Sequence, residues 1–556
     1  MGRQGCWWSG SNANWRPTVS DPCVMVVDAG TGSARVLAFD LNGNQIACAS
    51  REWTFPTLPQ YPGSRVFDTA ANWALISECI RETASSSRNA GFEISAVTAS
   101  SMREGMVLYD AARREIWGCP NIDARAVAEA DELVREGLAD RIYRTGGDWL
   151  GIISPPRFRW LARHEPEVLG NTRHVSMLSD WVLFKLSGEL VTDPSCGSSS
   201  GLFDLGSRTW SAELIGALGL AREIFPPVVE CGRIAGTVTK QAAVETALPV
   251  GCAVVSGGAD TQLALLGSGC VDSGALAVVG GTFWQTAIVS GHPMIDPQCR
   301  VRTLCHVAPG TSMTEGIGFL NGLAMRWLRD TLFESGYGPE DRYVRMDALA
   351  SDAAPGSEGI FAVVSNVMNA RCWIQPPLCF VGIESANPRH TGGPGRAAMV
   401  RSIQESAAFT ALAHYEILRS LTSGAPERLV FCGGASKGRS WPRIMAEVFD
   451  MPVAVPKISE TTSLGAAFCA ISALPDGPSI VEAAQQLVCW DRTEEPDRQR
   501  VEAYREIYEQ ARTITAGVHE WMLAGRLRAM WRAPGAIMAT TCPGFAEGGG
   551  HGSAPA

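Results

Sequence analysis

The chain has 556 residues, of which 46% are hydrophobic and 19% are charged, and this excludes a single small module. Its 47 basic and 57 acidic residues leave a net charge of −10, which supplies no general attraction to nucleic acids or anionic membranes. No apolar run approaches the roughly 18 residues of a membrane span, and residues 1–20 lack the apolar core of a secretory signal. We therefore expect a soluble cytoplasmic protein with neither nucleic acid nor membrane as a partner.

Cysteine and histidine do not form a metal-binding pattern. The 17 cysteines are scattered through apolar stretches and include no Cys-x-x-Cys pair, which favours buried free thiols over metal ligands. The histidines are dispersed too, and His164-Glu165 lacks the second histidine of a zinc-protease motif. We expect no metal that is held by protein side chains alone.

The first predicted elements are a strand at residues 24–27, a Gly/Thr-rich loop, a second strand at 34–41, a turn at Asn42-Gly43 and a third strand from Gln45. In a Rossmann or Walker loop, a helix follows the glycines, whereas here a strand follows them. No Gly-Lys-Ser/Thr occurs in the chain. The loop is more like the phosphate-binding hairpin of the actin-type ATPase fold.

A second copy of this pattern begins at Ala275, with a strand at residues 275–279, the loop Gly280-Gly281-Thr282 and a strand at 283–289. The two loops lie roughly 250 residues apart, which indicates an internal duplication at the scale of a domain. Two related lobes that each present a hairpin loop to a shared cleft would explain both copies.

Helical spacing of apolar residues recurs between the strands, for example over 320–328 and 441–448, and the alternation predicts an α/β fold for both lobes. The residues after Trp531 become rich in proline, glycine and alanine. We predict a disordered extension at 1–22, an N-terminal lobe at 23–270, a C-terminal lobe at 271–533 and a disordered tail at 534–556.

Asp260 is the best catalytic candidate. The strand at residues 252–256 leads through glycines to this carboxylate, at the end of a strand where α/β folds open their ligand crevices. A hydroxyl that attacks a phosphate needs an acceptor for its proton. The alternative is that Asp260 only caps the helix that follows.

Arg103 and Glu104 follow a predicted strand at residues 94–99. A neighbouring guanidinium and carboxylate can bind vicinal hydroxyls or a carbonyl group. The alternative for this pair is a solvated surface position.

The two loops carry the candidate phosphate contacts. Asp28 could hold a magnesium-bound water, while the loop beyond it offers backbone, hydroxyl and guanidinium donors to phosphate oxygens from Thr31, Gly32, Ser33 and Arg35. A third glycine-rich segment follows a strand at 429–432 and precedes a helix, and its glycines would let a purine and ribose approach the backbone at Gly433, Gly434, Ala435 and Ser436. A glycine-rich turn without function is the alternative for the first loop, and the repeat of the pattern at Gly280-Gly281-Thr282 counts against it.

In this order the elements resemble the FGGY carbohydrate kinases, a family of the actin and Hsp70-like, or ribonuclease H-like, ATPase superfamily. The first hairpin resembles the Asp-x-Gly-Thr loop of the family, and the resemblance extends from Val24 to Leu474. The other matching segments are the second loop Gly280-Gly281-Thr282, the catalytic segment Gly258-Ala259-Asp260, the adenosine segment Gly433-Gly434-Ala435, and residues 154–161, with Arg157 where lysine is usual.

The resemblance implies two α/β ATPase lobes with a cleft between them, ATP as the phosphoryl donor, and Asp260 as the base. It implies that Mg²⁺ arrives with ATP and contacts Asp28 and Asp260 only indirectly. The nucleotide contacts that it adds are Gly281, Thr282, Gly322 and Arg326, and the acceptor contacts that it implies are Arg103, Glu104, Asp260, Thr261, Gln262, Phe283 and Trp284.

Five stretches narrow the acceptor: 101–109, 121–125, 179–181, 280–285 and 319–330. They are similar to family members that phosphorylate the terminal hydroxyl of open 4,5-dihydroxypentane-2,3-dione, a form of the quorum-sensing signal autoinducer-2. The alternatives are a kinase for another ketose or polyol and a nucleotide-binding sensor without catalysis. Two positions depart from the glycerol kinases, with Ile152 in place of a tyrosine and Gly438 in place of an asparagine.

Overall fold

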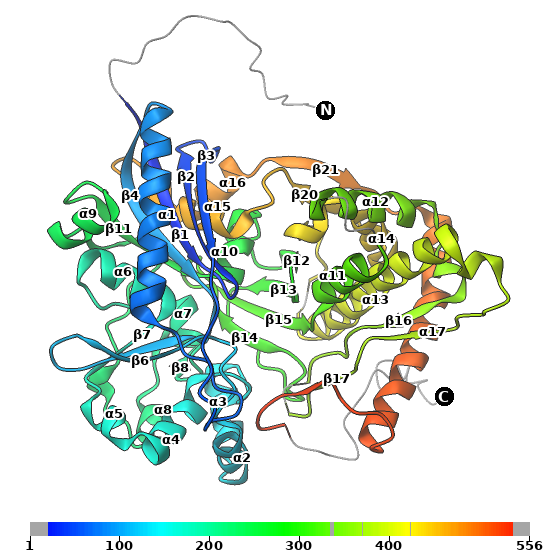
Figure 1. Ribbon diagram of the computed structural model, residues 1–556, viewed down its shortest axis with the longest axis horizontal. Helices are drawn as coiled ribbons and strands as arrows, with labels where there is room; N and C mark the ends of the chain where they lie inside the picture. The colour runs from blue at the N-terminus through cyan, green and yellow to red at the C-terminus, as the bar shows by residue number, and fades with distance from the viewer. Residues whose placement is uncertain (1–19, 334–337, 370, 423, 537–556) are drawn as a thin grey trace, which may run out of the picture.

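The computed structural model describes residues 20–333, 338–369, 371–422 and 424–536, which form two lobes built on mixed β-sheets (Figure 1). The predicted extension and tail lie outside the described residues, except at their inner ends. There, Asp21 and Pro22 belong to the first strand because they pair with Phe92 and Glu93, and residues 534–536 are buried. The predicted limits of both disordered segments are therefore corrected by these few residues.

The sheet of the N-terminal lobe has six strands. Its order from edge to edge is β10 (Ile234–Thr237), β11 (Ala253–Ala259), β4 (Phe92–Ser101), β1 (Asp21–Ala29), β2 (Ser33–Asp40) and β3 (Gln45–Glu52). Strands β11, β4 and β1 run parallel, whereas β2 and β3 continue from β1 as antiparallel hairpins. The carboxyl ends of β1, β4 and β11 therefore meet at one edge.

Both faces of this sheet are covered, so its central strands are buried on each side. Successive residues of β1 face opposite clusters, with Met25 and Val27 on one face and Val24 and Val26 on the other. The first face packs on α1 (Thr69–Asn89), α6 (Leu178–Ser187) and α9 (Lys240–Thr246), and the second on α10 (Asp260–Gly267), α15 (Thr461–Ser472) and α16 (Ile480–Leu487). Helices from beyond residue 271 thus complete the core of the first lobe.

A smaller layer completes the N-terminal lobe below the sheet in Figure 1. It holds the three-stranded sheet β6 (Glu115–Cys119), β5 (Met106–Tyr109) and β7 (His174–Met177) and a pair, β8 (Phe203–Asp204) and β9 (Thr209–Trp210). Its helices are α2 (Val127–Arg135), α3 (Leu138–Gly146), α4 (Ser154–His164), α5 (Pro166–Asn171), α7 (Pro194–Ser198) and α8 (Ala212–Ala217). Cys305 and Ile317 of the C-terminal lobe belong to the same buried cluster as this layer, so the lobes share apolar packing here.

The sheet of the C-terminal lobe repeats the strand order of the first. Its seven strands are β14 (Arg302–Cys305), β15 (Ser312–Gly318), β13 (Trp284–Ser290), β12 (Leu276–Gly280), β19 (Leu429–Cys432), β20 (Val453–Pro456) and β21 (Trp490–Glu494). Strands β12, β19 and β20 are parallel, and β13 and β15 extend from β12 as antiparallel hairpins, as β2 and β3 extend from β1. This confirms the predicted duplication.

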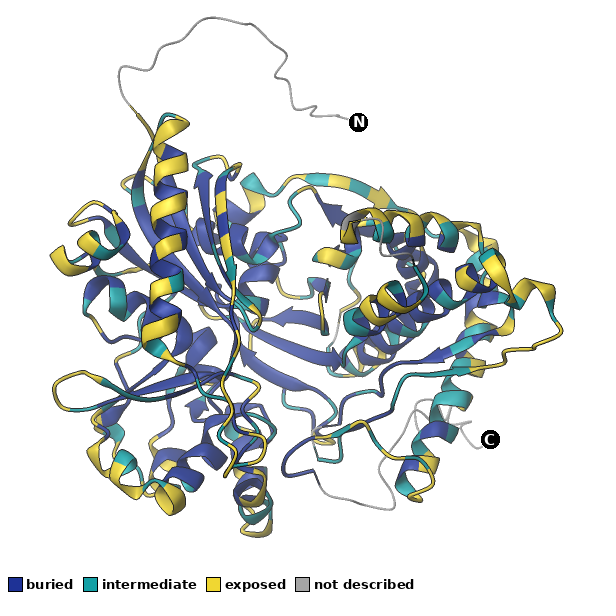
Figure 2. Cartoon of the chain, in the orientation of Figure 1, coloured by how far each residue is buried: buried dark blue, intermediate teal, exposed yellow. Residues whose placement is uncertain are grey.

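The helices of the C-terminal lobe are α11 (Asn321–Leu332), α12 (Pro339–Asp352), α13 (Gly392–Ser420), α14 (Ser440–Phe449) and α17 (Arg498–Leu523). Two short sheets join β16 (Phe361–Val363) to β18 (Cys379–Val381) and β17 (Ile374–Gln375) to β22 (Trp531–Arg532). Figure 2 shows buried strands at the centre of the lobes and exposed residues on the outer sides of α1 and α12.

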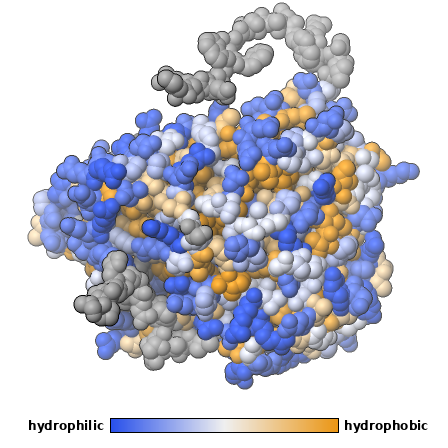
Figure 3. Space-filling model, turned by 180° about the vertical axis from the view of Figure 1, so that it is seen from behind, coloured by the Kyte–Doolittle hydropathy of each residue, from blue (hydrophilic) through white to orange (hydrophobic). Residues whose placement is uncertain are grey.

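In the part of the chain that the structure describes, no helix has the length and apolar character that crossing a membrane requires. On the face turned away in Figure 1, hydrophobic residues lie in several patches between hydrophilic ones (Figure 3).

Candidate active site

The first hairpin loop lies between β1 and β2 and is closed by a hydrogen bond from the Gly30 amide to the Ser33 carbonyl, 3.0 Å long. Asp28, at the end of β1, is buried, and its Oδ2 lies 2.7 Å from Nη2 of Arg35. The other Nη atom of Arg35 pairs with Glu460, just before α15. Arg35 therefore binds carboxylates of both halves of the chain, whereas Thr31, Gly32 and Ser33 are at least partly exposed at the loop.

Asp260 lies at the junction of β11 and α10, with 39% of its side chain exposed. Its Oδ1 accepts a 2.7 Å hydrogen bond from the Thr261 amide, as a residue at a helix start does. The same atom lies 3.8 Å from Nε of Arg103, so a capping contact is only part of its environment. Burial raises the pKa of Asp260 to about 6, Arg103 opposes this rise, and Asp28 and Glu104 add to it.

Arg103 and Glu104 follow β4 and are 6% and 2% exposed, which contradicts the surface alternative. Glu104 has a φ of 61°, a left-handed conformation that is uncommon for a residue other than glycine. Arg157 of α4 donates hydrogen bonds to the carbonyl oxygen of Glu104 and to three carbonyls between Pro120 and Asp123, so it holds this strained segment in place.

A buried ion-pair network surrounds this segment. Nη1 of Arg103 lies 2.7 Å from Oε1 of Glu315 on β15, and Nε of Arg302 on β14 lies 2.7 Å from the same oxygen. Nη1 of Arg302 is also 2.9 Å from Oε1 of Glu104 and 2.9 Å from Oδ2 of Asp148. Burial alone would raise the pKa of Glu315, but Arg103 and Arg302 hold it below its usual value. The network joins both lobes beside Asp260.

Sequence reasoning missed Arg302, Glu315 and Asp148. None of them stands in a recognisable motif, and Arg302 and Glu315 are brought together only by the register of β14 against β15. An arginine and a glutamate that face each other in a wholly buried hairpin are the one signal that could have found them.

The remaining predicted acceptor contacts separate into two groups. Thr261 and Gln262 follow Asp260 on α10, and Gln262 is fully buried, with long contacts of 3.5 Å to the carbonyls of Ser195 and Cys305. Phe283 is half-buried and packs edge-on against Phe319, with 5.1 Å between ring centroids.

Trp284 is placed differently from its prediction. It is 1% exposed and packs between Phe431 and Trp441, with centroid distances of 5.3 and 4.8 Å. Phe283, which directly precedes β13, packs against the buried cluster of the smaller N-terminal layer, whereas Trp284 belongs to the core of the C-terminal lobe. It offers no surface to an acceptor in this conformation.

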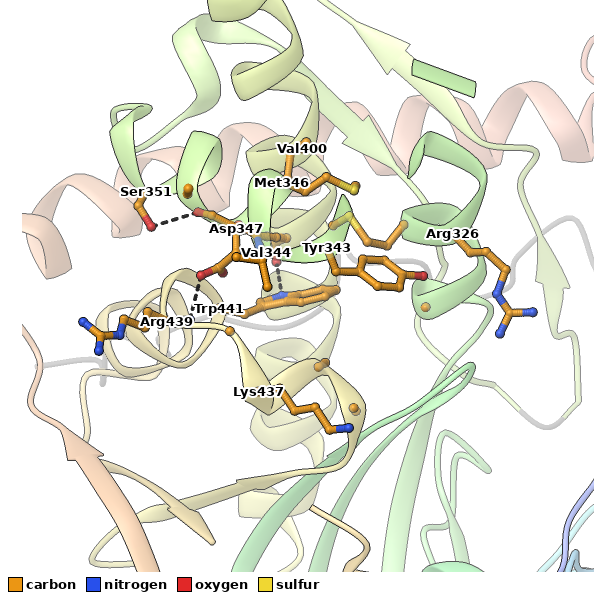
Figure 4. A pocket seen from close by; sticks show the side chains of 18 of the residues that line it. Arg326, Tyr343, Val344, Met346, Asp347, Ser351, Val400, Lys437, Arg439 and Trp441 are labelled. Carbon is orange, nitrogen blue, oxygen red and sulfur yellow. Dashed lines mark hydrogen bonds between the residues drawn. The ribbon is translucent and has the colours of Figure 1, made fainter. Parts of the chain in front are cut away.

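The second hairpin loop borders a cavity of about 610 Å³ in the C-terminal lobe (Figure 4). Of the predicted nucleotide contacts, the ones that line it are Gly281, Thr282, Gly322, Arg326, Gly434 and Ala435. Gly433 and Ser436 lie behind this surface: Gly433 has a φ of +85°, and a Cβ there would come within 2.8 Å of the Gly280 carbonyl, while the Ser436 hydroxyl donates to the Gly433 carbonyl. They shape the segment Gly434–Lys437, a 3₁₀ helix.

Further residues line this cavity, and apart from Lys437 and Gly438, which belong to the predicted glycine-rich segment, they were not predicted. Tyr343, Val344, Met346 and Asp347 come from α12, Val400 and Gln404 from α13, and Lys437, Gly438, Arg439 and Trp441 from the adenosine segment and α14. The wall is a mixture of aromatic rings, aliphatic groups and glycine backbone, which suits a flat heterocycle.

Glycine backbone borders the cavity both at the second hairpin loop and at the adenosine segment. A Cβ at Gly434 would meet nothing within 4 Å, so bare backbone faces open space there, whereas a Cβ at Gly322 would lie 2.2 Å from the Gly281 carbonyl, so α11 packs tightly on the loop. Within the described ranges, no three His, Cys, Asp or Glu residues form a group that would hold a metal ion.

Comparison with known proteins agrees with this arrangement. A model of the FGGY family of carbohydrate kinases, N-terminal domain, matches residues 23–267, and a model of the C-terminal domain matches residues 276–474. The chain therefore belongs to the FGGY family of carbohydrate kinases, a family that implies the use of ATP and a small sugar-like substrate. The family resemblance and the two-lobed α/β fold expected from the sequence are confirmed.

Two curated relatives are similar over most of their length. An autoinducer-2 kinase of Salmonella typhimurium is 37% identical over 527 residues, covering 93% of this chain and 98% of that protein. An autoinducer-2 kinase of Escherichia coli K12 is 38% identical over 525 residues, covering 92% and 97%. Among solved structures, a xylulose kinase from Rhodospirillum rubrum has a TM-score of 0.78 at 25% identity, covering 90% of this chain and 99% of that chain.

Proposed function

We propose that this chain is an autoinducer-2 kinase, which transfers the γ-phosphoryl group of ATP to the terminal hydroxyl of open 4,5-dihydroxypentane-2,3-dione. The observation that carries the chemistry is Asp260, a partly exposed carboxylate at the meeting edge of β1, β4 and β11, with Arg103 and Glu104 beside it. Support for the acceptor comes from the two relatives, which bear this activity in their names and cover more than nine-tenths of the chain.

In the proposed reaction, Asp260 accepts the proton of the terminal hydroxyl while the hydroxyl oxygen bonds to phosphorus and ADP leaves. With a pKa of about 6, Asp260 is ionised near neutral pH yet remains a better proton acceptor than an ordinary aspartate. Arg103 and Glu104 orient the carbonyl and hydroxyl groups of the acceptor. Their geometry is maintained by the ion pairs to Glu315 and Arg302.

The two hairpin loops would hold the phosphates from opposite lobes, with Thr31, Gly32 and Ser33 on one side and Gly281 and Thr282 on the other. Asp28 and Asp260 are the carboxylates that fit water-mediated contacts to Mg²⁺, an ion that usually keeps several waters and binds through one or two carboxylates and substrate phosphates. When bound, Mg²⁺ neutralises phosphate charge. We place the reaction in the cytoplasm, where it would convert a quorum-sensing signal to its phosphate.

The test is a coupled assay of ADP release with the dione, xylulose, ribulose and glycerol as acceptors. The proposal expects the highest kcat/KM for the dione, by at least about tenfold. A higher value for a pentulose would instead indicate a pentulose kinase. ADP release with none of the four, together with ATP binding in calorimetry, would favour a non-catalytic sensor.

A further inference from the structure

The cavity in the C-terminal lobe has two chemically different sides. On one side, the amide of Gly322 at the start of α11 donates to the Thr282 carbonyl, so the phosphate-type loop and α11 form a single wall. On the other side, Asp347 of α12 meets the turn that leads into α14. Figure 4 shows Arg326, from α11, on one side and Asp347 with Ser351 and Arg439 on the other. A nucleotide with its phosphates at the hairpin loop would therefore extend its base toward Asp347.

Asp347 is held by the backbone of that turn. Its Oδ2 accepts a 2.8 Å hydrogen bond from the Arg439 amide, and its Oδ1 accepts a 3.1 Å bond from the Ser440 amide and a further bond from the Ser440 hydroxyl. Gln404 in turn donates to the Ser440 hydroxyl oxygen at 2.9 Å. Since a carboxylate offers about four lone-pair positions, one position on Oδ2 stays available to a donor in the cavity.

Gly438 explains why a carboxylate can occupy this position. A Cβ at residue 438 would lie 2.5 Å from Oδ1 of Asp347, so a side chain there and the observed position of Asp347 exclude each other. Asp347 of α12 fills the space beside Gly438 from the opposite wall. The Asp347 carboxylate is an acceptor without any N–H to donate. Of the donors nearby, the Ser351 hydroxyl donates to the Asp347 carbonyl and the Gln404 amide donates to the Ser440 hydroxyl oxygen. The Arg439 side chain points away from Trp441 (Figure 4).

We propose that Asp347 selects the base of the nucleotide, because its carboxylate accepts a hydrogen bond from the exocyclic amine of adenine. Hypoxanthine carries a carbonyl oxygen at the same ring position, and that oxygen would face the carboxylate without a proton between them. Trp441, Tyr343 and Met346 supply the apolar surface that packs on the ring and does not distinguish the two bases. This inference rests on the use of ATP in the proposed function.

The experiment measures binding without an acceptor, by calorimetry with ADP, IDP and purine riboside 5′-diphosphate, which has only hydrogen at that ring position. The expected order of affinity is ADP, then the purine diphosphate, then IDP, with ADP at least about tenfold tighter than IDP. In Asp347→Asn, the amide can present an N–H to the carbonyl of hypoxanthine, so the ratio of the two affinities should fall to about one or invert.

Asp352→Asn makes the same change on the same helix, outside the residues that line the cavity, and should keep the wild-type ratio. Equal binding of ADP and IDP by the wild type would overturn the proposal, as would an unchanged ratio in a folded Asp347→Asn variant. If that variant does not fold, the order of the three ligands on the wild type still decides. If the protein binds ADP more tightly than IDP but releases ADP with no acceptor, the kinase function is refuted and this inference is not. If the protein phosphorylates an acceptor but binds ADP and IDP equally, this inference is refuted and the kinase function is not.

Discussion

Arg302 on β14 and Glu104 after β4 are 198 residues apart in sequence, yet Nη1 of Arg302 lies 2.9 Å from Oε1 of Glu104 in the buried space between the lobes. Arg302 also binds Glu315, whose Oε1 is shared with Arg103. The side chains proposed to hold the acceptor thus depend on a guanidinium from the opposite lobe. A substitution at Arg302 tests this dependence, because buried carboxylates that lose their charged partner are costly.

Arg302→Lys keeps the positive charge but cannot reach Glu104, Asp148 and Glu315 together, because an ammonium lacks the planar fork of a guanidinium. We expect the KM for the acceptor to rise about 10- to 150-fold, as the loss of one charge-assisted hydrogen bond costs about 1.5 to 3 kcal/mol, while the KM for ATP changes far less. Steady-state kinetics with each substrate varied in turn measures this difference.

Arg300→Lys is the matched control for this prediction, since Arg300 lies two residues earlier and pairs with Asp296 away from the network. A rise in the KM for ATP alone, or equal effects of the two lysine variants, would show that Arg302 does not position the acceptor site.

Asp260→Asn should lower kcat by a factor on the order of 10² to 10⁴, because the amide cannot accept the proton of the attacking hydroxyl. ATP affinity in calorimetry should stay close to that of the wild type. The thermal unfolding midpoint should not fall at pH 7. Folding raises the pKa of Asp260, so above the unfolded pKa the ionised carboxylate lowers the stability of the folded protein, and the amide removes that charge. The exposed Asp272 gives the control Asp272→Asn. Turnover within a few-fold of wild type would remove Asp260 from the role of base.

The acid limb of the kcat/KM profile should report Asp260. Since the carboxylate must be ionised to accept a proton, activity should be constant above a pKa of about 6 and fall about tenfold per pH unit below it. Arg103 lowers the pKa of Asp260, so Arg103→Met should move this limb to higher pH. A limb near pH 4, or one that Arg103→Met leaves in place, would contradict the assignment.

Gly322→Ala should weaken ATP binding, because the new Cβ would lie 2.2 Å from the Gly281 carbonyl and would force the phosphate loop away from α11. Acceptor KM at saturating ATP should change little. Gly517→Ala, in α17 with nothing within 4 Å of the added Cβ, provides the control and should be neutral or slightly stabilising. Isothermal titration with ADP distinguishes the variants, and equal affinities would mean that the close approach of Gly322 to the loop is not needed for the nucleotide.

Local sequence patterns were sufficient for the features that depend on local structure. The hairpin loops after Asp28 and Gly280, and Asp260 after its strand, could be predicted because each lies where a short apolar run ends in glycines. The repeat of the strand order also followed from the two similar hairpins.

Features that depend on tertiary packing could not be predicted in this way. The burial of Arg103 and Glu104 requires Arg302 and Glu315 from another sheet, and the cavity wall at Asp347 requires α12 to lie across the turn before α14. Trp284 was expected at the acceptor because of the family resemblance, and only its packing against Phe431 and Trp441 shows that it lies in the core.

The most direct test of the central claim is phosphorus NMR of the wild-type protein incubated with ATP, Mg²⁺ and 4,5-dihydroxypentane-2,3-dione. The proposed function predicts one new phosphomonoester signal, split into a triplet by the two protons of the terminal carbon, that grows in step with ADP. Release of inorganic phosphate alone, or a phosphomonoester formed from xylulose but not from the dione, would contradict it.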